Sequence, residues 1–165
     1  MKKLLLLLLC VPLIGLGQTE YKKTYYENGQ LQYEGNFIEG KEDGLHKEYY
    51  ENGQLWMEIN YKDDVINGLF RWYYENGQIK KEENYKDGER EGLRKRYHRN
   101  GNLSSEGNMI NGKEDGLHKN YWENGTLKSK GNMINGKKDG LHEIYDKKGR
   151  KIEMNYKEGK FIGEE

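Results

Sequence analysis

A repeated position of this chain holds the side chains best suited to metal binding, the histidines His46, His118 and His142. Phe70 and Arg94 occupy the same position in the other two copies of the repeat. A stable zinc site needs three or four ligands, and no further His or Cys is in phase with these three. A hairpin register that sets Gly131 between His118 and His142 would let two imidazoles lean together over a gap. We nevertheless expect a packing or surface role for these histidines and predict no bound metal or cofactor.

Three segments match the first seven positions of a phosphate-binding P-loop, namely 35–41, 107–113 and 131–137. The eighth position of that motif needs Ser or Thr to bind magnesium, whereas Glu42, Glu114 or Lys138 stands there in this chain. No helix is expected to follow and point its N-terminus at a phosphate. We therefore interpret the matches as copies of one hairpin loop and predict no nucleotide binding.

Catalytic chemistry has little support in the sequence. After residue 17 there is no Cys, and the serines are Ser104, Ser105 and Ser129. Neither a G-x-S-x-G nor an H-E-x-x-H arrangement occurs. Paired carboxylates for glycoside hydrolysis would need a cleft, which a shallow ribbon does not offer. We predict that the chain is not an enzyme and has no catalytic residue.

Positive charge gathers in one unit, through Arg90, Arg94, Lys95, Arg96, His98 and Arg99. Two interpretations are open. The unit is either a solvated strand neutralised by Glu89, Glu91 and Glu106, or a docking spot for an acidic partner surface. Breaks in a repeat are places where specificity arises, so Arg94, Arg96, His98 and Arg99 are candidate partner-binding residues.

Aromatic residues are the second candidate binding set, comprising Trp56, Trp72, Trp122, Tyr49, Tyr73, Tyr97 and Tyr121. Large amphipathic rings of this kind are enriched in binding hot spots. In a thin sheet the same rings could instead form the core, and both interpretations stay open. Rows of exposed Tyr and Trp also suit carbohydrate stacking, which is a further binding hypothesis.

These side chains must be positioned by a repeat of 24 residues. The glycines of five Asn-Gly dipeptides keep that step: Gly29, Gly53, Gly77, Gly101 and Gly125. A second series keeps the same step at an offset of 15: Gly44, Gly68, Gly92, Gly116 and Gly140. Two turns per unit imply two strands per unit, and a unit this short must stack on its neighbours to bury a core.

The Asn-Gly pairs predict type I′ hairpin turns, because both central residues of such a turn need positive φ. With Asn52-Gly53 as the turn, Tyr50 would face Leu55, Tyr49 would face Trp56, and Lys47 would pair with Glu58 as an opposite charge. Lys95 and Glu106 would repeat that pair. The Asp-Gly pairs are likewise interpreted as turn residues.

Strand alternation places Ile59 and Tyr61 on one face and Leu45 and Asn60 on the other. The glycines within strands, Gly35, Gly107 and Gly131, should leave space for a neighbouring aromatic ring or a bend. Hydrophobic residues make up 33% of the chain and charged residues 34%, which favours a thin sheet over a thick core. We predict an all-β fold, an elongated single-layer antiparallel sheet of stacked β-hairpins.

The first 17 residues belong to a different class. A charged start, an apolar run from Leu4 to Ile14 and a small-residue exit before Gln18 predict a signal-peptide helix over 1–17, cleaved between Gly17 and Gln18. The protein would then be periplasmic or secreted, or anchored if the signal stays uncleaved. Residues 18–165 form the predicted repeat domain of about five and a half repeats, with a degenerate C-terminal cap from residue 149 whose charges block edge pairing.

The best-preserved unit resembles the MORN repeat. The resemblance is carried by Tyr33-Glu34-Gly35-x-Phe37-x-x-Gly40-Lys41-x-x-Gly44, and the added Tyr-Tyr-Glu-Asn-Gly-Gln-Leu segment resembles the bacterial variant of that repeat. It covers residues 21 to 160, with Asp64 where Gly40 would recur. The resemblance implies an open sheet of hairpins that binds or scaffolds other proteins. Some bacterial members of the variant are labelled antitoxins of toxin-antitoxin systems.

Lysine and arginine together number 28, as do aspartate and glutamate, so no net positive field attracts nucleic acid or anionic lipid. The leading hypothesis is an exported, non-catalytic module that binds a protein or scaffolds an assembly at the cell envelope. An antitoxin or immunity protein that neutralises a toxin is the alternative, and a carbohydrate-binding module is third. An edge or face dimer is left open, and no nucleic-acid partner is expected.

Overall fold

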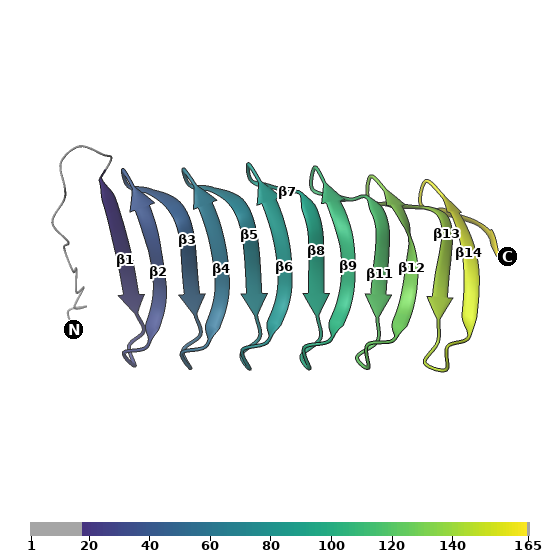
Figure 1. Cartoon of the computed structure of the whole chain (residues 1–165), viewed down its shortest axis with the longest axis horizontal. Coiled ribbons are helices and arrows are strands. Elements are labelled where there is room, and N and C mark those ends of the chain that lie inside the picture. Colours follow the sequence, from purple (N-terminus) through teal and green to yellow (C-terminus); the bar gives the residue numbers. More distant parts are fainter. Residues whose placement is uncertain (1–17, 165) are drawn as a thin grey trace.

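The computed structural model describes residues 18–164, which form one open antiparallel sheet without any helix (Figure 1). The predicted all-β, single-layer stack of hairpins is confirmed. Within residues 18–164 there is accordingly no helical segment that could span a membrane. The predicted signal-peptide helix of residues 1–17 lies outside the described residues.

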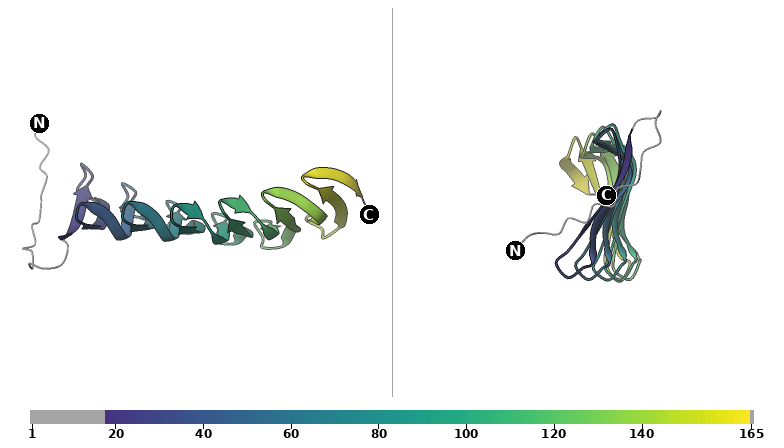
Figure 2. Two further views of the ribbon diagram at one scale, coloured as in Figure 1. Left: turned by 90° about the horizontal axis from the view of Figure 1, so that it is seen from above. Right: turned by 90° about the vertical axis from the view of Figure 1, so that its left-hand side faces the viewer.

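Apart from two short strands, each strand pairs with the next one along the chain, so the sheet is a continuous meander. The two-residue strands β7 and β10 pair only with β6 and β9 and lie off the main order. Figure 2 shows the result as a long ribbon, one layer thick, that curves at its C-terminal end. The strands are β1 Thr19–Tyr25, β2 Leu31–Ile38, β3 Lys41–Tyr49, β4 Leu55–Lys62, β5 Val65–Tyr73, β6 Ile79–Lys86, β7 Glu89–Arg90, β8 Gly92–Tyr97, β9 Leu103–Ile110, β10 Lys113–Glu114, β11 Gly116–Tyr121, β12 Leu127–Ile134, β13 Lys137–Tyr145, β14 Lys151–Lys157 and β15 Lys160–Glu164.

Type I′ turns occur at one edge of the ribbon, here called the I′ edge, and not at the five Asn-Gly pairs of the 24-residue series. Glu39 and Gly40, between β2 and β3, have φ values of 52° and 81°. Positive φ at both central residues defines this turn. The same pattern recurs at residues 63–64, 87–88, 111–112, 135–136 and 158–159. Asp64 keeps the turn with a φ of 65°, although a glycine would suit this conformation better.

The five Asn-Gly pairs of that series form the opposite edge, here called the Asn-Gly edge, through three-residue turns, so the type I′ geometry predicted for them is wrong. The amide of Gly53 donates to the carbonyl of Tyr50 at 2.9 Å, and the amide of Tyr50 donates to the carbonyl of Gln54 at 2.8 Å. Gly53 has a φ of 83°, whereas Asn52 is not in the positive-φ region. This is a type I turn followed by a left-handed glycine. The Asn52 Oδ1 accepts from the amide of Gln54 at 2.9 Å, which stabilises this turn.

The register is as predicted away from the turns and differs beside them. Lys47 pairs with Glu58, and the predicted pair of Lys95 and Glu106 is confirmed as well. Tyr49 faces Leu55 and not Trp56, because the register shifts between Glu48 and Tyr49. Tyr50 therefore lies in the turn and not opposite Leu55.

The second glycine series marks bulges and not turns. Gly44 has a φ of 89° and lies within β3, where the pairing with β2 shifts between Gly35–His46 and Phe37–Glu42. The equivalent positions Gly92 and Gly116 begin β8 and β11, after the short strands β7 and β10. Extra residues in one strand are accommodated by such positive-φ positions, so the interpretation of Asp43-Gly44 and its equivalents as strand-to-strand turns is wrong. Asp87-Gly88, in contrast, does form such a turn at the I′ edge.

The best-buried side chains lie on one face, here called the inner face, and most of them follow a central row across the strands, with Met109 two residues to the side of it. The register runs from Gly35 to His46, Ile59, Phe70 and Glu83, and resumes from Arg94 to Gly107 and from His118 through Gly131 and His142 to Met154. Leu45 pairs with Asn60 on the other face, as predicted, and stays 39% exposed. The core is therefore a single line of contacts, as a one-layer sheet requires.

Candidate interaction surface

The three repeat-phase histidines each cover a glycine of their own unit. A Cβ built on Gly131 would lie 2.1 Å from Nδ1 of His142, and one on Gly35 would lie 2.5 Å from Nδ1 of His46. His118 covers Gly107 in the same way. The expectation that these glycines leave space for a ring is confirmed, and the ring is an imidazole.

The histidine nitrogens are used inside the sheet. Nε2 of His46 donates to the backbone carbonyl of Asn36 at 2.7 Å, and the Tyr33 hydroxyl lies 2.6 Å from Nδ1. His118 and His142 donate likewise to the carbonyls of Asn108 and Asn132. His118 leans on Gly107 and not on Gly131, so the arrangement in which two imidazoles share a gap does not occur. Residues 18–164 contain no group of three metal-ligating side chains that could hold an ion.

Two units fill the central row differently. Ile59 takes the place of the glycine and faces Phe70. Glu83 takes that place in the next unit, is 1% exposed and accepts ion pairs from Lys81 at 3.0 Å and Arg90 at 3.2 Å. Burial alone would raise the pKa of the Glu83 carboxyl, but the hydrogen bond and charge of Lys81, with Arg90, lower it.

The predicted partner-binding tyrosines form a ladder on the other face. The hydroxyls of Tyr49, Tyr73, Tyr97 and Tyr121 donate to the carboxylates of Glu34, Glu58, Glu82 and Glu106, at 2.6 to 2.8 Å. Burial, with the hydrogen bond to the carboxylate, raises the pKa of Tyr73, Tyr97 and Tyr121 to about 12. The hydroxyls thus join neighbouring strands, and a role of these tyrosines in partner binding stays a prediction.

A column that sequence reasoning missed ties each Asn-Gly turn to the next unit. Tyr50 and Tyr74 donate to the carbonyls of Tyr73 and Tyr97, both at 2.9 Å, and the indole N–H of Trp122 donates to the carbonyl of Tyr145 at 3.3 Å. His98 fills the same position and donates to the carbonyl of Tyr121 at 3.1 Å. The 24-residue spacing of these residues is the signal that could have identified the column.

The three tryptophans are not gathered in one place. Trp72 lies on the inner face, stacked on Phe70 with ring centroids 3.4 Å apart, and the Lys81 ammonium lies 3.7 Å from its centroid. Trp56 is 37% exposed, and its ring centroid is 6.2 Å from that of Tyr50. Trp122 lies at the Asn-Gly edge. Trp72 therefore belongs to the inner face, whereas Trp56 and Trp122 lie beside the turns of the Asn-Gly edge.

The predicted basic residues are also separated. Arg94 stands in the central row, only partly exposed, and its guanidinium pairs with the Glu114 carboxylate. Arg96 is exposed on the inner face, opposite Lys81. His98 and Arg99 belong to the Asn-Gly edge. Arg94 is thus held by an internal ion pair, while Arg96 and Arg99 present charge to solvent.

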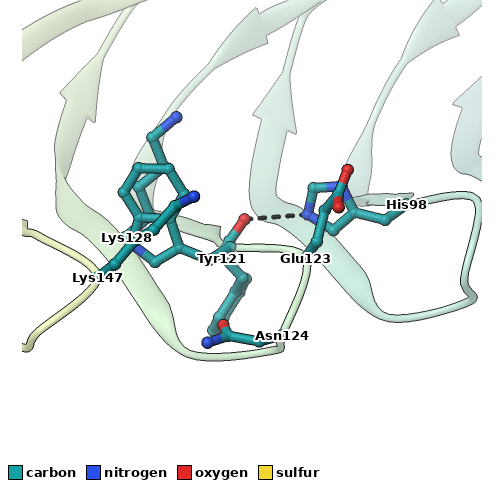
Figure 3. Close-up of a pocket in the computed structure, with 7 residues that line it drawn as sticks. His98, Tyr121, Glu123, Asn124, Lys128 and Lys147 are labelled. Atoms are coloured by element: carbon teal, nitrogen blue, oxygen red, sulfur yellow. Dashed lines mark hydrogen bonds between the residues drawn. The ribbon is translucent and has the colours of Figure 1, made fainter.

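Two open hollows lie at the Asn-Gly edge. The larger, about 520 Å³, is lined by Trp122, Lys128, Lys147 and His98 among others. In Figure 3, Lys128 and Lys147 lie at one end of this hollow and His98 at the other. The second, about 450 Å³, is lined by Trp72, Tyr74, Lys80, Lys81 and Arg96 among others. Tyr74, Lys80, Lys128 and Lys147 are residues that the sequence analysis did not single out.

Comparisons with known proteins give a family for the repeats. The family model described as "MORN repeat variant" matches residues 21–39, 42–63, 66–87, 90–111 and 114–135. No curated protein matches. A solved structure described as a crystal structure of the GtfA/B complex bound to UDP and GlcNAc is similar over 69% of this chain and 22% of that one, at 12% identity and a TM-score of 0.30. The chain thus spans about a fifth of that matched chain's length.

Proposed function

Since the chain belongs to the MORN repeat variant family, we propose that it is a non-catalytic protein-binding or scaffolding module that acts at the cell envelope. Export through residues 1–17 is part of this proposal. A repeat ribbon offers an extended surface in place of an enclosed site. Binding, and not reaction, is the output that such a surface supports.

The observation that carries the proposal is the chemistry of the Asn-Gly edge. Its hollows combine half-buried rings with exposed cations. Aromatic rings are enriched where proteins bind each other, and the cations offer charge that can complement an acidic partner. On the face opposite the inner face, the hydroxyls of the tyrosine ladder already donate to glutamate carboxylates of the sheet itself. We therefore place the partner on the Asn-Gly edge.

Site-specific photocrosslinking in cells tests this proposal. A photoreactive amino acid replaces Glu75 or Glu123, which are exposed at the Asn-Gly edge. Matched controls carry it in place of Lys113 or Lys137, which are exposed at the I′ edge. We expect one protein adduct from both Asn-Gly positions, recovered with the envelope fraction, and none from the controls. Equal adducts from both edges, or none from either, would count against the proposal, and a toxin as the crosslinked protein would favour the antitoxin alternative.

A further inference from the structure

Two aromatic rings at the Asn-Gly edge each carry a pair of cations. The Tyr74 ring centroid lies 5.7 Å from the Lys80 ammonium and 5.5 Å from the Arg99 guanidinium carbon. The Trp122 ring centroid lies 4.5 Å from the Lys128 ammonium and 5.5 Å from that of Lys147. We call Tyr74, Lys80 and Arg99 the first clamp, and Trp122, Lys128 and Lys147 the second clamp.

The two clamps occupy the same three positions of the repeat, two units apart. In the other three units with an Asn-Gly turn, neither of the two cation positions holds a Lys or an Arg. Tyr26 is accompanied by Gln32 and Glu51, Tyr50 by Trp56 and Glu75, and His98 by Ser104 and Glu123. The ring is therefore present in all five units that carry an Asn-Gly turn, whereas the cations come as a pair or not at all. The hairpin itself does not require them, because units without them keep the same turn.

The clamp cations are exposed and carry no ion pair with a carboxylate of residues 18–164. Several other lysines of the sheet are paired, as Lys119 is with Glu106 and Lys130 with Glu143. A ring attracts a cation through its electron-rich face without neutralising the charge. Each clamp thus holds two positive charges in place and leaves them available to an anion.

The chemistry of the clamps favours carboxylates over neutral sugars. Stacking of a sugar needs a free ring face, but in each clamp cations already lie close to the ring. We propose that the two clamps bind two carboxylates of one extended acidic peptide segment of the partner, which crosses the strands along the Asn-Gly edge. This inference rests on the proposed protein-binding function and identifies the chemistry of the partner.

The spacing of the clamps sets the spacing of the carboxylates. Tyr74 follows β5 and Trp122 follows β11, and these strands are four steps apart in the sheet. At about 4.8 Å per step the clamps are about 19 Å apart, which an extended chain spans in about six residues. An even number of residues places both carboxylates on the same side of the extended peptide. Glu123, which lines the hollow beside His98 between the clamps, repels an acid placed midway.

Binding of synthetic peptides to the full-length chain tests the proposal. Labelled Gly-Ser peptides carry Glu at the first and seventh positions, at the first and third positions, or Gln in place of both. We expect the wild-type chain to bind the first peptide at least about tenfold more tightly than the other two, by fluorescence anisotropy. The double variants K80E/R99E and K128E/K147E should each lose about the same factor. K113E/K137E has the same change in net charge at the I′ edge and should bind as the wild type does.

Several outcomes would overturn the two-clamp assignment. These are equal weakening by K113E/K137E, indifference to the spacing of the glutamates, and tighter binding of an oligouronate than of any peptide. Circular dichroism and melting temperature verify that each variant keeps its fold; a clamp variant that unfolds is replaced by the milder K80Q/R99Q or K128Q/K147Q. If the crosslinks from Glu75 and Glu123 persist in folded clamp variants, the protein-binding function stands and the clamps are wrong.

Discussion

The central row of the inner face and the Asn-Gly edge follow opposite rules. The central row varies from unit to unit, with Gly35 beside His46, Ile59 beside Phe70, and Glu83 followed by Arg94. At the edge, the Asn-Gly pair returns unchanged five times. Residues of the row contact each other across strands, so two of them can change together. At the edge, the asparagine side chain binds backbone atoms, which are the same in every unit, so the residue is kept.

The edge asparagine explains this constancy. The Asn76 Oδ1 accepts from the amide of Gln78 at 3.1 Å, and its Nδ2 donates to the carbonyl of Arg99 in the next turn at 3.1 Å. Asn28 and Asn100 make the same pair of contacts. Aspartate could accept but not donate. The asparagine therefore both stabilises its own turn and joins it to the next unit.

The largest effect should come from placing the side chain of one unit into another. Gly131→Ile puts a branched side chain where the His142 ring lies, and we expect a loss of about 3 kcal/mol in unfolding free energy from overpacking. The double variant G131I/H142F recreates the Ile59–Phe70 pair and should recover most of the loss. Urea unfolding of both variants and of H142F gives the coupling energy. Additive effects would show that the row does not vary pair by pair.

Removing the buried carboxylate should cost less. Glu83→Ala leaves Lys81 without its partner in a partly buried place, and we expect a loss of about 2 kcal/mol. Arg90 is 44% exposed and should return to water at little cost. Glu89→Ala, an exposed carboxylate beside the same strands, is the control for charge alone. Equal losses in the two variants, by urea unfolding, would contradict a special role for Glu83.

A change at the edge should be smaller again. Asn76→Asp keeps the acceptor for the Gln78 amide and removes the donor to the Arg99 carbonyl, so we expect a loss of about 0.5 kcal/mol. Asn76→Ala removes both contacts and should cost more. Thermal unfolding measures the difference. If the aspartate variant is as stable as the wild type, the link between units contributes nothing and the constancy of Asn needs another reason.

The smallest effect concerns pH. Burial, with the nearby Lys138 charge, lowers the pKa of His142 although its hydrogen bond to the Asn132 carbonyl opposes this. The unfolded chain then binds the proton more readily, so this contribution to stability is complete above about pH 6.5 and is lost as the pH falls through that value. We expect the urea midpoint to fall more between pH 7.5 and 5.5 for the wild type than for G131I/H142F. Identical pH profiles would show that His142 is not the group responsible.

Much of this fold could be predicted from the 24-residue period, because each turn and strand is local. The pairs Lys47–Glu58 and Lys95–Glu106 and the space over Gly35 followed from register. The turn types could not be predicted as well. Positive φ is tolerated by Asn, Asp and Gly alike, so Asn-Gly fits both a two-residue turn and a three-residue turn. Which one forms depends on the bulge at Tyr49, and thus on pairing with the next strand.

The candidate surface was less accessible to sequence reasoning. Arg94, Arg96, His98 and Arg99 are close in sequence, but alternation and the turn place them at different sites. The charges that share a ring, such as Arg99 and Lys80, come from neighbouring units. Contiguity in sequence indicated a single basic spot, whereas the sheet brings together residues that are 19 positions apart.

The sequence by itself determined a repeating antiparallel ribbon, because turn residues and strand alternation act over a few residues and recur at one period. Tertiary structure alone decided which glycine each histidine covers, which carboxylates are neutralised and which cations stay unpaired. Those outcomes depend on contacts between side chains on different strands, and such contacts exist only after the units have stacked.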